Sequence, residues 1–131
     1  MGGIALVIHE SAEDYLETIL ILRERNGLVR SIDIVNELGV TKPSVSVAMK
    51  KLRGDGYILT DGDGYITLTE KGQGVADRIY ERHKVLTALL ITIGVDGETA
   101  AADACKMEHD LSDQTFAKLK EYMENCKKHC G

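Results

Sequence analysis

Apolar residues recur at helical spacing along most of the chain, and short glycine-containing stretches interrupt the pattern. Near the start, Leu16, Ile19 and Leu20 fall on one face of a helix. The periodicity predicts six helices. Their expected ranges are 10–25, 31–38, 42–54, 73–93, 98–109 and 112–127.

Small polar residues mark where several of these helices should begin. Ser31, Thr41 and Ser112 stand at the starts of periodic runs, and a hydroxyl there can accept a hydrogen bond from the first helical turn. Pro43 suits the first turn of the helix that Thr41 would cap. The second and third helices are joined by a tight turn containing Gly39, which is typical of a helix-turn-helix.

After the third helix the pattern changes from helical to extended. Residues 57–60 and 65–69 are rich in β-branched and aromatic residues, and the Asp/Gly turn 61–64 separates them. This combination predicts a β-hairpin, which after a helix-turn-helix forms a wing. We therefore expect a mainly α fold with a small β-hairpin, in which a winged helix-turn-helix DNA-binding domain (1–72) precedes a helical domain (73–131).

The predicted third helix is a local exception to the acidic character of the chain. The formal net charge is −5, which is the wrong sign for binding DNA by bulk electrostatics. Between Thr41 and Arg53, however, there is no acidic residue. Hydroxyls and methyls near the helix start can reach base edges, and lysines can neutralise phosphates, although protein contacts alone are an alternative use for a winged helix. The candidate DNA-binding residues are Thr41, Lys42, Pro43, Ser44, Ser46, Val47, Lys50 and Lys51.

Three potential metal ligands are closely spaced near residue 105. Cys105, Glu108 and His109 stand at i, i+3 and i+4, so a helix would project them from one face. Thiolate and imidazole favour a transition metal over calcium. The alternative is an ordinary amphipathic helix with a buried cysteine and a solvated Glu-His pair.

Further potential ligands lie on two other predicted helices. Asp14 and Glu17 share a face of the first helix, and His83 lies in the fourth. Each is unremarkable alone, because charged residues usually face solvent. Together with Cys105, Glu108 and His109 they form a set of six, which would be costly to bury without a cation. Spacing alone does not show that they converge.

Composition limits the remaining choices. Three cysteines are an odd number and argue against a disulfide framework, and Cys126, His129 and Cys130 form a C-x-x-H-C spacing that we interpret as a C-terminal tail rather than a metal site. No run approaches the roughly 18 apolar residues of a membrane span. We expect a cytoplasmic protein with no membrane partner.

The order of motifs resembles the diphtheria toxin repressor family of metal-dependent transcriptional regulators over residues 11–123. The resemblance implies a homodimer that binds palindromic operator DNA when loaded with Mn(II) or Fe(II), represses metal-homeostasis genes, and uses residues 73–131 for dimerisation and metal binding. The motifs that carry it are Glu13-Asp14-Tyr15-Leu16-Glu17-Thr18-Ile19, Val40-Thr41-Lys42-Pro43-Ser44-Val45-Ser46, Leu68-Thr69-Glu70-Lys71-Gly72, Arg82-His83 and Cys105-Lys106-Met107-Glu108-His109-Asp110-Leu111-Ser112.

By length and ligands the chain is most similar to the short, manganese-responsive branch, that of the manganese transport regulator. The branch has ligands matching five of the six candidates, but it usually carries a glutamate where this chain has Cys105. Iron-responsive members have a cysteine there, a methionine at Asp14, and second-site ligands where Thr87 and Ala101 stand here. The chain is a hybrid of the two ligand sets. We expect two cation sites per subunit, with Co(II), Ni(II) or Zn(II) also bound in vitro.

Two other functions are compatible with parts of the sequence. A metal-independent winged-helix regulator would use Cys105, Cys126 and Cys130 to sense oxidation. A metallohydrolase would need a general base, a substrate pocket and an open metal position, and the chain carries no nucleophile elbow, phosphate loop or H-E-x-x-H motif. We therefore expect a regulator that is not an enzyme.

Overall fold

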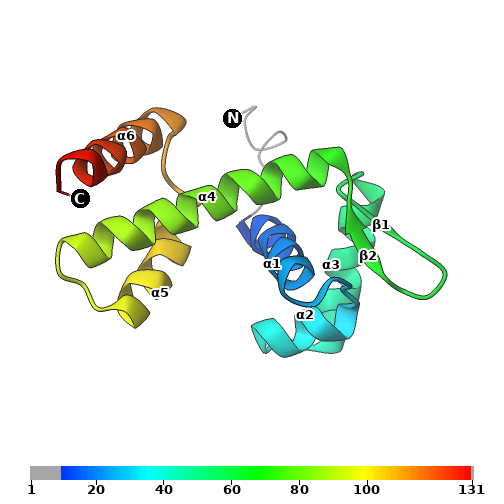
Figure 1. Ribbon diagram of the computed structural model, residues 1–131. Helices are drawn as coiled ribbons and strands as arrows, with labels where there is room; N and C mark the ends of the chain where they lie inside the picture. Colours follow the sequence, from blue (N-terminus) through cyan, green and yellow to red (C-terminus); the bar gives the residue numbers. More distant parts are fainter. Residues whose placement is uncertain (1–9, 131) are drawn as a thin grey trace. The chain divides into compact units, whose positions relative to one another are not determined.

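The computed structural model describes the backbone of residues 10–130 and the side chains of residues 11–127. Contacts divide the chain into two compact units, Met1–Asp77 and Arg78–Gly131. The fold is mainly α with one antiparallel hairpin, as the sequence predicts (Figure 1). The elements are α1 (Glu10–Asn26), α2 (Ser31–Leu38), α3 (Lys42–Gly54), β1 (Ile58–Thr60), β2 (Ile66–Leu68), α4 (Glu70–Thr92), α5 (Gly97–Met107) and α6 (Asp113–Cys130).

The first unit is a winged helix built on the apolar face of α1. This helix packs on α2, α3 and β2, while α3 also packs on α2 and β1. The predicted apolar stripe is buried, since Leu16 and Ile19 of α1, Ile34 of α2 and Val45 of α3 are all inaccessible to solvent. Burial of such side chains contributes about 1.5–3 kcal/mol each. The α3 helix is thereby held by its inner face, which leaves its outer face at the surface.

Both α2 and α3 span their predicted ranges, and the cap of α3 agrees with the sequence prediction, whereas the cap of α2 lies one residue earlier than predicted. Thr41 caps α3 by accepting a hydrogen bond from the Ser44 amide at 3.3 Å. The cap of α2 is Arg30, not Ser31, because the Asp33 carboxylate accepts the Arg30 N–H at 2.8 Å and fixes residue 30 as the last extended residue. The prediction of Ser31 as a cap was therefore wrong.

The wing is a short antiparallel hairpin in the predicted place. Ile58 pairs with Leu68 and Thr60 with Ile66. In the turn, the Asp61 carboxylate accepts the amides of Asp63 and Tyr65, both at 2.9 Å. The Ile66 N–H also donates to the Val29 carbonyl at 2.7 Å, which ties the wing to the loop between α1 and α2.

The long helix α4 begins at Glu70, three residues before the predicted start at Gln73. The Thr69 hydroxyl accepts the Gly72 amide at 3.1 Å and so caps a turn that the apolar pattern does not mark. A side chain at Gly72 would collide with the Tyr57 carbonyl oxygen. Glycine therefore lets the first turn of α4 lie directly against the chain entering the wing.

In the second unit, capped helix ends define the segment that carries most of the candidate ligands. Asp96 caps α5 by accepting the Thr99 amide at 3.0 Å, and this hydrogen bond lowers the pKa of the Asp96 carboxyl. Ser112 caps α6, as predicted, by accepting the Thr115 amide at 3.1 Å. The α5 helix ends at Met107 rather than at the predicted His109.

Two polar links join α4 to α6 within this unit. At the surface, Lys120 pairs with Glu81 at 2.7 Å. From the interior, the almost fully buried Arg82 reaches the exposed Asp113 carboxylate at 2.6 Å. Within the described residues, no helix is both long enough and apolar enough to cross a membrane.

Candidate metal centre and nucleic-acid interface

The centre of the candidate metal site is the Glu108 side chain, which is completely buried. Glu108 follows the last residue of α5 and keeps helical backbone angles (φ −61°, ψ −25°), with its N–H bonded to the Ala104 carbonyl at 3.0 Å. Its Oε2 lies 3.0 Å from His83 Nδ1, and its Oε1 lies 3.6 Å from His109 Nε2. The carboxylate thus has an imidazole beside each oxygen.

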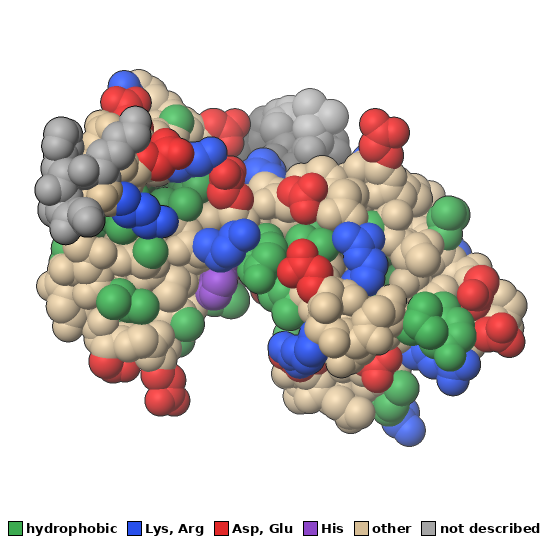
Figure 2. Space-filling view, in the orientation of Figure 1, with side chains coloured by type: hydrophobic (Ala, Val, Ile, Leu, Met, Phe, Trp, Pro, Cys, Tyr) green, Lys and Arg blue, Asp and Glu red, His purple; other side chains and the backbone are tan. Residues whose placement is uncertain are grey.

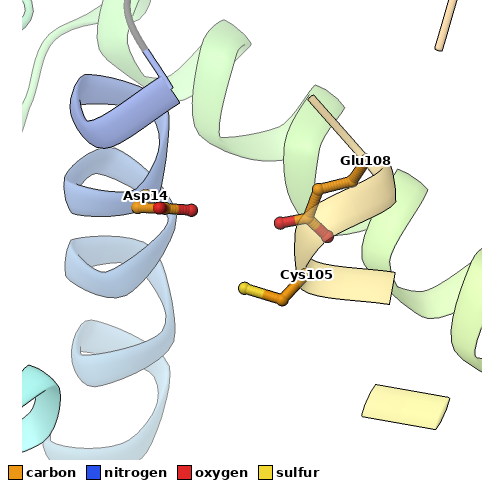
Figure 3. Close-up of side chains that lie close together, drawn as sticks. All are labelled: Asp14, Cys105 and Glu108. Atoms are coloured by element: carbon orange, nitrogen blue, oxygen red, sulfur yellow. The ribbon is translucent and has the colours of Figure 1, made fainter. Parts of the chain in front are cut away.

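Cys105 lies one turn before Glu108 and is exposed. Its Sγ is within 4.8 Å of a Glu108 carboxylate oxygen. Figure 3 shows the thiol and the carboxylate projecting to the same side of the chain. The prediction that residues 105, 108 and 109 belong to one helix was wrong, because α5 ends at Met107. The residues still gather, since Glu108 retains helical angles and the turn that follows brings the His109 ring back to it.

One oxygen of this carboxylate is suited to a cation. Among the described side chains, Glu108 Oε1 is one of the few buried polar atoms that make no hydrogen bond. Burying a carboxylate oxygen without a hydrogen bond raises the free energy of the folded state unless a positive group compensates it. Thiolate, carboxylate and imidazole donors together match a transition-metal ion. The residues of the second unit therefore fit the metal that the ligand set predicts.

Asp14 and Glu17 lie one turn apart on α1, in the first unit. The Glu17 side chain is buried and that of Asp14 is half-buried, so neither is an ordinary solvated charge. Figure 3 shows the Asp14 carboxylate projecting outward from α1. That these two carboxylates join the ligands of the second unit stays a prediction.

The C-x-x-H-C spacing near the C-terminus is only partly visible. Cys126 is half-buried on α6. The side chains of His129 and Cys130 lie outside the described residues. The interpretation of this segment as a tail therefore also stays a prediction.

All eight candidate DNA-binding residues are exposed on α3 or at its cap. Val47 is the most informative, because 70% of its surface is accessible although it is apolar and lies in the middle of a helix. The Val47 methyls and the Ser44 and Ser46 hydroxyls are thus exposed together, and groups of these kinds can contact base edges. That they contact DNA stays a prediction. Over the surface of the winged helix, positive and negative side chains alternate (Figure 2). Within α3 itself, Lys42, Lys50 and Lys51 are exposed and no acidic residue occurs.

Arg82 is a residue of the site that the pattern of metal-ligand types in the sequence did not predict. It donates to the carbonyls of Glu108 and Leu111, at 3.1 and 2.6 Å. A signal was present, because Arg82 stands on the same helical face as the buried Ile79 and Leu86. A charged residue within an apolar stripe must have buried partners.

Comparison with known proteins agrees with both halves of this description. Residues 8–65 match the profile described as iron dependent repressor, N-terminal DNA binding domain, and residues 69–130 match iron dependent repressor, metal binding and dimerisation domain. An HTH-type transcriptional regulator of Methanocaldococcus jannaschii is 38% identical over 120 residues, which is 90% of this chain and 96% of the relative. The chain belongs to the iron dependent repressor family.

Other members support the same assignment. The HTH-type transcriptional regulator MntR of Bacillus subtilis is 34% identical over 114 residues, covering 87% of this chain and 80% of the relative. The solved structure of the manganese regulator SloR is 29% identical with a TM-score of 0.77, covering 86% of this chain. The chain spans about half the length of that structure, 53%. Members of this family are metal-dependent transcriptional regulators, which favours metal dependence over the thiol-oxidation alternative.

Proposed function

We propose that this family member is a repressor that binds operator DNA as a homodimer when loaded with Mn(II) or Fe(II), and that it controls metal-homeostasis genes. The observation that carries the proposal is the buried Glu108 carboxylate, with His83, Cys105 and His109 around it, in a chain that also has an exposed basic recognition helix. A regulator of this kind would act on DNA in the cytoplasm.

The proposed ligands lie on α1, on α4, on α5 and in the turn that follows α5. His83, Cys105, Glu108 and His109 would hold the cation from the second unit, and Asp14 and Glu17 would complete the set from α1. Their buried or half-buried carboxylates support this role, because uncompensated burial of charge is costly. The six donors could hold two cations per subunit, either as neighbours or as one tightly and one weakly bound ion. Asp14, Glu17 and Glu108 favour a hard ion such as Mn(II), whereas a Cys105 thiolate raises the affinity for Fe(II), Co(II), Ni(II) and Zn(II).

The proposed mechanism couples α1 to DNA binding. A bound cation supplies positive charge that offsets the carboxylates. As ligands of that cation, Asp14 and Glu17 would restrain α1, and the packing of α1 on α2 and α3 would pass this restraint to the recognition helix. With α1 restrained in both subunits, the two recognition helices of the dimer would have a fixed separation. That separation would match one spacing between the half-sites of a palindromic operator. Without the cation, carboxylate repulsion opposes the same arrangement.

The test is an anaerobic titration with Mn(II), Fe(II), Co(II) and Zn(II), read out by binding to a duplex that the protein itself selects from a random pool. We expect affinity to rise sharply with Mn(II) or Fe(II) and to fall again with chelator. DNA binding that is identical in chelator and in metal would refute the proposal. A Cys105→Glu variant should shift the preference toward Mn(II) relative to Co(II) and Zn(II), whereas Cys126→Ser, which removes a thiol from α6, should not.

A further inference from the structure

Arg82 holds the segment that follows α5 at three points. Its Nη1 donates to the Glu108 and Leu111 carbonyls at 3.1 and 2.6 Å, and its Nη2 donates to Asp113 Oδ1 at 2.6 Å. Its guanidinium carbon also lies 5.2 Å from the centre of the Phe116 ring. One side chain of α4 thereby connects the end of α5, the turn and the start of α6.

An arginine suits this position better than a lysine. The carbonyls beyond the end of a helix have no partner within it, and a guanidinium presents several donors in a fixed plane. A lysine ammonium is a single point that does not reach all three acceptors with the same geometry. Only 3% of the Arg82 side chain is exposed, so its charge is almost fully desolvated.

A contribution to folding stability does not by itself explain a buried arginine at this position. Replacing a buried ion pair by apolar side chains is often neutral or stabilising. Here the burial is also imperfect, because Arg82 Nε makes no hydrogen bond with any residue that the structure describes. The Asp113 side chain is 91% exposed, so the carboxylate partner is well solvated and compensates the buried charge only partly. A role in positioning other residues would explain why Arg82 is buried here although its desolvation is unfavourable.

Neighbouring residues of α4 hold the two ends of Glu108. Arg82 binds its backbone carbonyl, and His83 lies 3.0 Å from its carboxylate. We propose that Arg82 is a positioning residue for metal binding, which fixes the 108–112 turn so that Glu108 and His109 face His83 before a cation arrives. This inference rests on the proposed metal-dependent function.

Because Arg82 is positively charged, the direction of the change in cation affinity on its removal tests the proposal. If Arg82 acted only as a nearby charge, its neutralisation would strengthen cation binding, because like charges repel. If it positions the ligand turn, its loss should weaken binding. Outer-shell partners of metal ligands typically account for about 10–100-fold in affinity.

The experiment measures Mn(II) binding to the full chain without DNA, from the free Mn(II) signal in electron paramagnetic resonance. We expect Arg82→Gln to lower the affinity at least about tenfold, Arg82→Lys to restore part of it, and Asp113→Asn, which leaves both carbonyl contacts, to have a smaller effect. Lys120→Gln breaks the surface link between α4 and α6 and should leave the affinity unchanged. Thermal unfolding in chelator is measured for every variant, and Mn(II) binding is compared at a temperature at which all of them are folded.

The outcomes separate this inference from the function on which it rests. If the native chain binds neither Mn(II) nor, in an anaerobic titration, Fe(II), the proposed function fails. If the native chain binds and folded Arg82 variants bind equally or more tightly, Arg82 has only a structural role and the inference is overturned. If Arg82→Gln does not fold, Arg82→Lys and Asp113→Asn decide, since unchanged affinity in both would contradict positioning.

Discussion

The Glu108 carboxylate has no solvent exposure, an imidazole 3.0 Å from one oxygen, and no hydrogen bond on the other from the described residues. In the absence of metal this arrangement opposes folding, because a buried charged oxygen loses its hydration without full compensation. With a cation the same oxygen becomes a ligand. Residues that serve a binding site often reduce stability in this way.

Replacing Glu108 by glutamine should therefore separate stability from metal binding. Glu108→Gln keeps the shape and removes the buried charge, so we expect the chelator-treated variant to unfold at the same temperature as the native chain or higher. Its Mn(II) affinity should fall at least about tenfold, since even outer-shell changes have that effect. Glu121→Gln, an exposed substitution on α6, is the control. A large loss of metal-free stability would instead mean that Glu108 is structural.

The ligand types and two of the helix caps were predictable at this scale because they depend on nearby residues. The hydroxyls of Thr41 and Ser112 cap α3 and α6 as their positions imply. Arg82 was not identified, because its partners lie 26 to 31 positions away along the chain. The position of Arg82 on the buried apolar face of α4 predicts that it is buried, but it does not predict which groups accept its hydrogen bonds.

The start of α4 offers a test at the scale of an element. A Gly72→Ala side chain would collide with the Tyr57 carbonyl, whereas the same change at Gly74, two residues later in the same helix, meets no atom within 4 Å. We expect Gly72→Ala to lower the free energy of unfolding by about 1–3 kcal/mol. Gly74→Ala should raise it by about 0.5–1 kcal/mol through helix propensity. Urea unfolding measures both, and equal effects would show that the contact with the wing is unimportant.

The recognition helix α3 should act on DNA through its exposed lysines. Lys50 is exposed, and a phosphate contact there would release about one counterion. Lys50→Gln should weaken binding to all duplexes similarly and reduce the slope of log affinity against log salt by about 1. Lys118→Gln makes the same charge change on α6 and should alter neither. If the two variants behave alike, the effect comes from net charge and not from a contact of α3.

The identity and order of the helices could be read from periodicity, but several of their ends could not. The α4 helix starts three residues early because Thr69 caps it, and α5 stops at Met107 although Cys105, Glu108 and His109 have helical spacing. A cap is a hydrogen bond of one side chain, and apolar spacing carries no information about it. The spacing of Cys105, Glu108 and His109 thus correctly predicted that they lie close together, but not that α5 ends before Glu108.

At the scale of the whole chain, the proposed function depends on relations between residues far apart in sequence. Asp14 and Glu17 precede Cys105 by most of the length of the protein, and periodicity assigns each of them a helix face without specifying which helices meet. The six-ligand set was accordingly derived from donor chemistry and a family resemblance. The net charge of −5 adds a second possible effect of metal, since any bound cation reduces repulsion of DNA.

Operator geometry distinguishes these two effects of metal. If the cation mainly fixes the recognition helices of a dimer, the gain in affinity should require correctly spaced half-sites. Adding about 5 base pairs between half-sites rotates one by about half a turn, and we expect the Mn(II)-dependent gain, about 5–150-fold for typical allosteric coupling, to disappear on that duplex. Binding in chelator should change much less. Fluorescence anisotropy with both duplexes measures the gain, with Ca(II) as a divalent control that the sulfur and nitrogen ligands disfavour. A gain that survives the added base pairs, or that Ca(II) reproduces, would mean that the cation acts by reducing charge repulsion rather than by orienting the helices.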